Sequence, residues 1–215
     1  MSKLRIHISI SLDGFTAGPN PSPESPLGEG GERLHDWVVP LAAWRKPHGL
    51  QGGEVNASTR IFEEALENVG AGVMGRNMFG PVHGGAWDEE PWMGWWGETP
   101  PFHSPVFILT HHGRQPVEMK GGTTFHFVTD GIEVALEQAR QAAAGKDVML
   151  WGGASVAQQY LAAGLLDEIE LHVVPVLLGD GIRLFDNLGD ADVRLEPLRT
   201  VEAPGVAHLK YRVAK

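Results

Sequence analysis

Apolar and polar residues alternate at the start of the chain, and the spacing then changes to that of a helix. Residues 4–12 follow the period of two that is typical of a half-buried strand. Residues 57–69 have apolar positions three and four apart, and Gly70 directly afterwards is suited to a helix C-cap. We therefore expect a strand and then a helix, whose buried face consists of Ile61, Phe62, Ala65, Leu66 and Val69.

Strand and helix patterns continue to alternate along the chain. Asp130, three residues before Glu133, predicts the start of one helix, and a second helix is predicted over residues 154–165. Strands are predicted within residues 71–80, 105–112, 124–128, 147–151 and 167–179, and a terminal hairpin over residues 193–201 and 206–214. This order predicts an α/β fold, with a mixed, mainly parallel sheet between helices and an antiparallel hairpin at its edge.

Two long segments are too rich in Gly and Pro for regular structure. The first, from about Gly18 to Asp36, is predicted to be a lid over a binding site. The second, residues 80–105, holds four tryptophans within ten residues, which either stack on a planar ligand or pack against the core or a partner subunit. Packing is the favoured interpretation for these tryptophans, which are Trp87, Trp92, Trp95 and Trp96.

Composition narrows the classes of function. The 215 residues include no cysteine, so thiolate chemistry and Cys-ligated metals are excluded. A formal charge of -10 argues against a general binder of nucleic acid or anionic membrane, since polyanions would be repelled. No apolar run approaches the length of a membrane span, and the N-terminus shows no signal-peptide pattern. We expect residues 1–215 to form a single domain of a cytoplasmic protein.

Paired glycines mark one predicted strand end. In parallel α/β sheets, ligands bind at the carboxyl ends of strands, where the free amides of helix N-termini attract anions. Gly152 and Gly153 stand between a strand and a helix, so the main chain there can approach a diphosphate closely. The amides that would face it belong to Ala154, Ser155 and Val156. The alternative is that the two glycines only make a tight turn.

Basic and polar residues follow two other predicted strands. Gly75 and Arg76 end one strand, and the other ends in Thr110, His111 and His112, with Arg114 close behind. The tandem histidines suit a phosphate better than a metal, because neighbours on a strand point to opposite faces. We predict no metal site. Without an Asp or Glu at this strand end to bind a ribose 2′-hydroxyl, a 2′-phosphate fits better, and the indicated cofactor is NADPH.

In combination, these motifs resemble a known family. The stretches "ISISLDGFTAG", "VMGRNMFG", "VFILTHH" and "WGGASVAQQYLAAGLLDEIELHVVPVLLGDGIRLF", in this order, are similar to the dihydrofolate reductase-like superfamily. The similarity is greatest to the branch of the riboflavin-biosynthesis reductase (RibD C-terminal) domain and its stand-alone relatives. It implies a three-layer αβα fold and NADPH bound by Gly75, Arg76, Asn77, Thr110, His111, Gly152, Gly153, Ala154, Ser155 and Val156.

The resemblance also has consequences for the peptide backbone, the assembly and the proton donor. It implies a cis peptide bond between Gly152 and Gly153, and a homodimer. The carboxylate that protonates the pterin in dihydrofolate reductases has no clear counterpart here. The catalytic residue is therefore unknown, and the carboxylates that we consider are Asp13, Glu32 and Asp36, with Glu24 and Glu29 in the same loop. Asp13 is also suited to capping the turn at Gly14.

The leading hypothesis is an NADPH-dependent reductase that transfers hydride to a small heterocycle, either pterin-like or ribosylaminopyrimidine-like. A non-catalytic NADP-binding or ligand-sensing protein on the same fold is the alternative. A metal-dependent hydrolase built on the histidines is a third. We expect a small-molecule substrate and neither a nucleic acid nor a membrane as partner.

Overall fold

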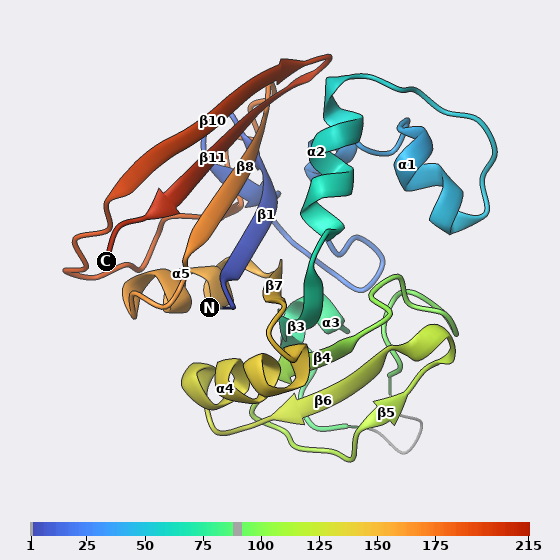
Figure 1. Ribbon diagram of the computed structural model, residues 1–215, viewed down its shortest axis with the longest axis vertical. Coiled ribbons are helices and arrows are strands. Elements are labelled where there is room, and N and C mark those ends of the chain that lie inside the picture. Colours follow the sequence, from blue (N-terminus) through green and yellow to red (C-terminus); the bar gives the residue numbers. More distant parts are fainter. Residues whose placement is uncertain (1, 88–91) are drawn as a thin grey trace.

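The computed structural model describes residues 2–87 and 92–215, which form a mixed α/β fold around one large sheet (Figure 1). The strand order is β10-β11-β8-β1-β7-β3-β4-β6-β5. The six strands from β8 to β6 in this order run parallel, whereas β10, β11 and β5 pair antiparallel. The bounds are β1 Leu4–Ser11, β3 Val69–Gly75, β4 Pro105–Leu109, β5 Val117–Glu118, β6 Thr124–Val128, β7 Asp147–Gly152, β8 Glu168–Val174, β10 Leu195–Ala203 and β11 Val206–Val213.

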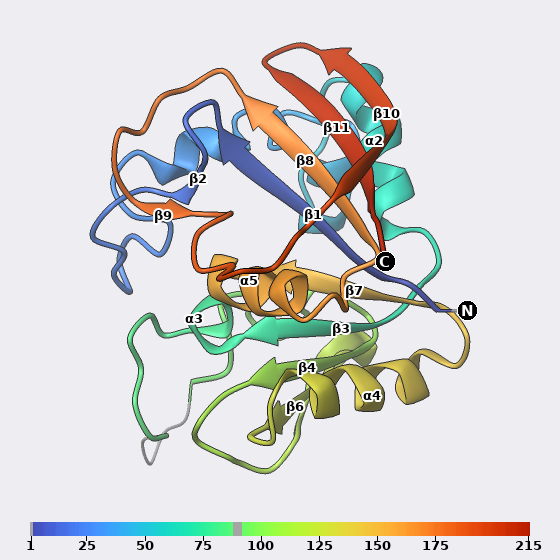
Figure 2. The same cartoon turned by 90° about the vertical axis from the view of Figure 1, so that its left-hand side faces the viewer.

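Helices cover both faces of this sheet, as the sequence predicts. Figure 2 shows α4 (Ile132–Ala143) and α5 (Ala154–Ala162) on the near face and α2 (Ala57–Leu66) on the far face. Short elements also cover the far face, and a two-stranded ribbon of β2 with β9 contacts β1. These elements are β2 Phe15–Ala17, η1 Gly31–His35, α1 Ala42–Arg45, η2 Lys46–His48, α3 Arg76–Phe79 and β9 Ile182–Arg183, while η3 Lys120–Gly122 lies near β5.

The main core lies between the sheet and the helices α4 and α5. Leu4 and Ile6 of β1 are completely buried there, together with Tyr160 of α5. Each such aliphatic side chain contributes about 1.5–3 kcal/mol relative to an exposed one. The hydroxyl of Tyr160 donates to the carbonyl of Ile132 at 2.7 Å, so its polar end is satisfied within the core. This packing fixes the strand ends that precede α5.

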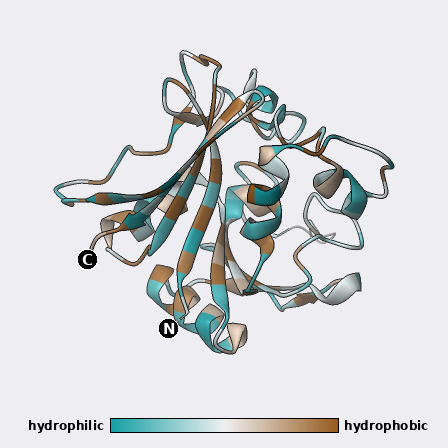
Figure 3. Ribbon diagram, turned by 45° about the horizontal axis from the view of Figure 1, so that its top comes forward, coloured by the Kyte–Doolittle hydropathy of each residue, from teal (hydrophilic) through white to brown (hydrophobic). Residues whose placement is uncertain are grey.

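The opposite face of β1, β8 and β11 is polar and is nevertheless covered. Alternating hydrophilic and hydrophobic bands run along these strands (Figure 3). Glu170 and His172 of β8 and His208 of β11 belong to the polar set, and at most 6% of each is exposed. A smaller apolar cluster around Leu34, Trp37 and Leu41 lies over this face, so burial here comes from the covering segments. The sheet therefore separates an apolar layer from a buried polar one.

The structure corrects three local predictions. The helix expected to end at Gly70 ends at Leu66, because Asn68 takes a left-handed conformation (φ 57°) and Val69 already belongs to β3. The helix α4 begins after Gly131 and has no side-chain cap, so Asp130 does not cap it. The strand expected to include His111 and His112 ends at Leu109.

The expected cis peptide bond between Gly152 and Gly153 is also wrong. The cis bond among the described residues joins Gly80 and Pro81. The chain instead turns from β7 into α5 through the positive φ angles of Gly152 (137°) and Gly153 (59°), which make the turn with a trans bond. In residues 2–87 and 92–215 we find no helix with the length and apolar character that crossing a membrane requires.

Candidate functional site

A cavity of about 410 Å³ lies between the polar face of the sheet and the segments that cover it. Pocket volumes of this order suit small organic ligands. One end is formed by Gly152 and Gly153 at the start of α5, and the floor by His7 and His172. The roof consists of Pro21, Pro26, Leu27, Trp37, Val38, Phe62, Ala65 and Leu66. The cavity thus joins a predicted anion-binding turn to an enclosed, largely apolar space.

The roof includes the loop predicted to be a lid. Within this loop the amide of Gly18 donates to Leu27 at 2.8 Å, and the amide of Glu29 donates to Pro19 at 2.9 Å. Leu34, in the 3-10 helix that follows, is completely buried. Hydrogen bonds within the segment and the burial of Leu34 therefore hold it in place over the cavity. A change in its order on ligand binding stays a prediction.

At the glycine end, the backbone conformation of Gly153, and not a lack of space, disfavours a side chain. Gly153 (φ 59°, ψ 137°) has a conformation that residues with a Cβ rarely adopt. A Cβ added there would meet no protein atom within 4 Å, so the space beside this residue is open. The first amides of a helix lack intrahelical partners, and those of Ala154 and Ser155 follow directly. The turn therefore offers free N–H donors next to open space.

Trp151 forms the wall beside this turn. Its ring lies where a side chain on Gly72 of β3 would be, since a Cβ there would come within 2.2 Å of the indole nitrogen. That nitrogen, Nε1, is buried and has no hydrogen-bond partner among the described residues. The side chain lines the cavity. Because this nitrogen is buried against Gly72, the part of Trp151 that lines the cavity is the apolar part of its ring.

The cavity floor carries a chain of histidines. Nδ1 of His172 lies 2.8 Å from Nδ1 of His208, and Nε2 of His208 lies 3.0 Å from the hydroxyl of Ser58 in α2. Trp37 packs against both imidazoles, with ring centroids 4.6 Å and 5.0 Å away. Its own N–H donates to the hydroxyl of Ser9 at 3.0 Å. This network ties α2 and the Trp37 segment to the polar face of the sheet.

Burial keeps these imidazoles neutral. Desolvation, with smaller contributions from Arg5, Lys210 and Arg199, lowers the pKa of His7 to about 3. Desolvation also holds the pKa of His172 well below its usual value and lowers the pKa of His208 to about 4. The two histidines of the floor, and His208 behind them, are therefore uncharged at neutral pH.

The predicted cofactor residues divide into two groups. Gly152, Gly153, Ala154 and Asn77 line the cavity. Gly75 does not, because a Cβ there would meet Cγ2 of Val156 at 2.8 Å, and Val156 is itself buried in the core. The glycine at position 75 therefore serves the packing of α5 on β3. Ser155 is exposed at the first turn of α5.

The basic residues form a separate cluster around Trp87. The guanidinium of Arg76 lies 4.0 Å from the Trp87 ring and donates to the carbonyl of Gly80, and that of Arg114 lies 4.8 Å from the same ring. Desolvation and the neighbouring Arg114 lower the pKa of Arg76. Thr110 is buried and accepts from the amide of His112 at 3.1 Å, whereas the side chains of His111 and His112 are exposed. This cluster lies outside the cavity wall.

The tryptophan-rich segment packs as the favoured interpretation predicts. The indole N–H of Trp87 donates to His112, that of Trp92 to Phe79 and that of Trp95 to Met78, at 2.8, 2.7 and 3.0 Å. Trp96 packs against Phe102 in the same apolar cluster. None of the four lines the cavity. The rings therefore anchor residues 92–105 to α3 and β6.

A family model described as the RibD C-terminal domain matches residues 2–208. The chain belongs to the RibD C-terminal domain family. Against curated proteins, it is 39% identical over 86 residues to the uncharacterized protein YyaP of Bacillus subtilis, a match that covers 40% of this chain and 45% of that protein. The match thus spans less than half the length of this relative.

Solved structures show the same fold at low sequence identity. A putative riboflavin biosynthesis protein from Shewanella is 20% identical with a TM-score of 0.64, and the match covers 99% of each chain. The riboflavin biosynthesis reductase Rib7 of Saccharomyces cerevisiae is 11% identical with a TM-score of 0.56, over 99% of this chain and 90% of that one. The dihydrofolate reductase-like architecture predicted from the sequence is thereby confirmed.

None of the carboxylates considered as proton donors lines the cavity of this RibD C-terminal family member. Asp13 accepts from the hydroxyl of Ser11 at 2.6 Å and from the amides of Leu178 and Gly179 at 3.2 and 2.8 Å. These bonds, that of Ser11 first, lower its pKa to about 2, so it is ionised and holds the loop after β8. Glu32 and Asp36 are exposed, as are Glu24 and Glu29.

Sequence reasoning missed the residues that form the cavity floor. His7, His172 and His208 occupy alternate positions in strands whose other face is apolar, a pattern that indicates a solvated face. The signal in the sequence was the alternation of these histidines with apolar residues in three strands; the register that pairs His208 with His172 and His7 with Glu170 comes from the structure alone. Within residues 2–87 and 92–215, no three metal-ligating side chains come together.

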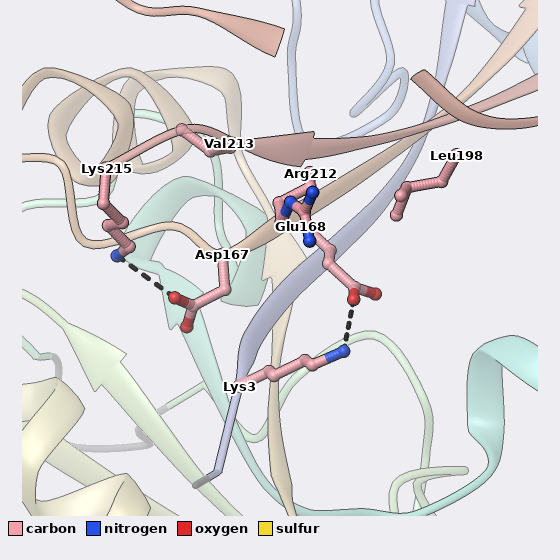
Figure 4. A pocket seen from close by; sticks show the side chains of 7 residues that line it. All are labelled: Lys3, Asp167, Glu168, Leu198, Arg212, Val213 and Lys215. Carbon is pink, nitrogen blue, oxygen red and sulfur yellow. Dashed lines mark hydrogen bonds and ion pairs between the residues drawn. The ribbon is translucent and has the colours of Figure 1, made fainter. Parts of the chain in front are cut away.

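A second hollow of about 390 Å³ lies at the opposite end of β1 and β8 (Figure 4). Lys3 pairs with Glu168 at 2.5 Å and Lys215 with Asp167 at 3.1 Å across it. Its charges are held in ion pairs, including Arg212 with Glu196, and it lies at the amino ends of the parallel strands. Open α/β sheets bind ligands at the carboxyl ends of their strands, so the candidate site is the cavity at Gly153.

Proposed function

We propose that this protein is an NADPH-dependent reductase that transfers hydride to a small planar heterocycle of the pterin or ribosylaminopyrimidine type. The observation that carries the proposal is the joining of two features in one cavity. The turn at Gly153 offers open space and free amides to a diphosphate, and the adjoining apolar volume suits a ring system. Membership of a family named for a riboflavin-biosynthesis enzyme, and the likeness to a yeast reductase, support it.

The residues around the turn fit such a cofactor. Gly152 and Gly153 would allow the diphosphate to approach the main chain, and the amides of Ala154 and Ser155 would hold it. The indole ring of Trp151 forms part of the adjoining wall. When bound, the dihydronicotinamide supplies the hydride, while the protein orients the acceptor and excludes water through Trp37, Met149 and Phe62.

Preference for the 2′-phosphate is assigned to the exposed residues after β4. His111 and His112 are exposed near the partly buried guanidinium of Arg114 and can reach a ligand on the surface. Arg76 donates to the carbonyl of Gly80 and stacks on Trp87, so its part in this preference is to hold the loop. NADPH rather than NADH is the cofactor we propose.

One observation favours the alternative of a non-catalytic NADP-binding protein. The part of the cavity wall that the structure describes carries no carboxylate, so the acid that dihydrofolate reductases use has no counterpart there. Reduction of a ring C=N bond needs a proton as well as a hydride. On the reductase proposal that proton reaches the acceptor from water or from an imidazole of the wall.

Titration of NADPH and NADH, followed by the fluorescence of the reduced nicotinamide, tests the cofactor. Turnover is then measured as loss of absorbance at the nicotinamide band with dihydropterin, flavin and ribosylaminopyrimidine acceptors. We expect saturable NADPH binding and turnover of at least one acceptor. Binding without turnover of any of them would favour the non-catalytic alternative, and no binding would reject both.

A further inference from the structure

The histidine chain on the cavity floor has a defined order of protons. We infer that it presents the Nε2–H of His172 to the cavity as a hydrogen-bond donor, and that the ligand there is an uncharged planar ring with an acceptor, a carbonyl oxygen or an imine nitrogen. His208 and Ser58 are positioning residues that set this order. The inference rests on the proposed function only in identifying the ligand with the hydride acceptor.

The geometry of His172 leaves one ring nitrogen for the cavity. Its Nδ1 is turned toward Nδ1 of His208 at 2.8 Å. No described residue forms a hydrogen bond with Nε2, and the ring lines the cavity although only 6% of the residue is exposed. Trp37 packs against the ring at 4.6 Å and keeps it in this orientation.

Two neutral imidazoles that share a hydrogen bond have two arrangements of protons. In the first, His172 donates from Nδ1, His208 carries its proton on Nε2, and Nε2 of His172 is an acceptor. In the second, His208 donates from Nδ1 and accepts at Nε2, and His172 carries its proton on Nε2. The contacts of the chain beyond His208 decide between them.

Ser58 decides in favour of the second arrangement. Its side chain is completely buried, and His208 is the partner that its hydroxyl has among the described residues, at 3.0 Å. In the first arrangement, the Ser58 hydroxyl accepts from His208 and its own proton has no acceptor. In the second, that proton is donated to Nε2 of His208. A completely buried donor without a partner is costly, whereas the Nε2–H of His172 faces the cavity, where water or a ligand can accept from it, so the second arrangement prevails.

The surroundings keep both rings uncharged. His172 faces His7, His35 and His208 from the neighbouring elements, and His7 faces Arg5, Lys210, Arg199 and Glu168. Glu170 accepts from Arg199 at 2.9 Å and lies 3.5 Å from Nδ1 of His7, so it is shared with a guanidinium. No described carboxylate is among the groups that face His172. A cationic ligand would lack a counter-ion at this end of the cavity.

The proton order can be measured without a ligand. Long-range ¹H–¹⁵N NMR spectra of the full chain distinguish protonated from unprotonated imidazole nitrogens. We expect the proton of His172 on Nε2 in the wild type, and a mixture of both forms in Ser58→Ala, which removes the deciding donor. A wild-type spectrum with the proton on Nδ1 of His172, or an unchanged spectrum in Ser58→Ala, would overturn the inference.

The ligand class is tested with 1,3-dimethyllumazine, an uncharged planar ring with acceptors and no N–H donor, by quenching of tryptophan fluorescence. We expect saturable binding, weakened about tenfold in His172→Phe. The matched control is His126→Phe, because His126 of β6 stacks on Phe107 of β4 away from the cavity wall, and the affinity of this variant should equal that of the wild type. No binding to the wild type, or equal affinity in His172→Phe, would reject the ligand class.

NADPH affinity, measured on the same three proteins, separates this inference from the proposed function. If the wild type does not bind NADPH, the reductase proposal is rejected, and the NMR and dimethyllumazine results still decide the role of His172. Normal NADPH binding with no effect of His172→Phe on dimethyllumazine would reject the inference alone. Ser58→Ala leaves the imidazole in place, so its spectrum decides even if His172→Phe fails to fold.

Discussion

Replacing Gly153 with alanine tests two properties of the turn: the backbone conformation that it requires, and the open space that it leaves for a ligand. The residue has φ 59° and ψ 137°, and a Cβ there meets nothing within 4 Å. The cost to folding is therefore backbone strain alone, about 1–3 kcal/mol. In a chain of this length, each kcal/mol lowers Tm by about 2–4 °C, so we expect a decrease of roughly 2–12 °C.

The added methyl group should also weaken NADPH binding at least about tenfold, because it occupies the space beside the amides proposed to hold the diphosphate. Gly189→Ala is the matched control. Gly189 has φ 60° and also nothing within 4 Å of an added Cβ, and it lies outside the cavity wall. Both variants should lose stability in thermal melts, and only Gly153→Ala should lose affinity in a fluorescence titration. Equal NADPH affinity in the two variants would refute the proposed diphosphate site.

Four further outcomes are expected. The double variant His111→Ala/His112→Ala should reduce the ratio of NADH to NADPH dissociation constants about tenfold or more, since each charge-assisted contact with a 2′-phosphate contributes roughly 1.5–3 kcal/mol. An unchanged ratio would show that these histidines do not bind the 2′-phosphate. Asp13→Asn should lower Tm at pH 7, and the difference from the wild type should shrink as pH falls from about 4 toward the lowered pKa of about 2, because the wild-type carboxylate then loses its charge too. The free energy of unfolding should fall as pH decreases below about 6.5, because in the unfolded chain His7 and His208 bind protons that they do not bind in the folded state (pKa about 3 and about 4). Denaturant titrations should show a decrease of about 1.4 kcal/mol per pH unit for each such histidine. His172→Phe should remove one such contribution. Hydrogen exchange in residues 18–36 should slow on saturation with NADPH, and unchanged exchange would make this segment a static part of the roof.

The sequence contains most of the fold because its apolar pattern follows the elements closely. Each predicted strand from residues 4–12 to the terminal hairpin is present, and α5 ends two residues before Gly164. The errors concern element ends, where local geometry competes with pattern. At Asn68 the left-handed conformation starts β3 early, and at Leu109 the strand stops before the histidines that follow it.

Only part of the candidate site could be predicted from the sequence. The glycine turn at Gly152 and Gly153 could be found, because a motif that precedes a helix has a local signature. The floor of His7 and His172, with His208 behind it, could not, since it depends on strands brought together from opposite ends of the chain. Arg76 has contacts that the sequence does not indicate, because only the tertiary structure brings the Trp87 ring and the carbonyl of Gly80 to its guanidinium; its part in cofactor binding stays a prediction.

The two-sided character of the sheet has a consequence for the fidelity of folding. Shifting β1 by one residue against β8 would exchange its faces, so that Arg5 and His7 would enter the layer of α4 and α5 while Leu4 and Ile6 would face Glu168 and Glu170. Each misaligned pairing of this kind would bury a charged side chain among apolar side chains and leave another charged side chain without its ion-pair partner. A strand that is apolar on both faces tolerates such slippage far better. The polar layer thus selects against misregistered intermediates while the molecule assembles, whatever it binds afterwards.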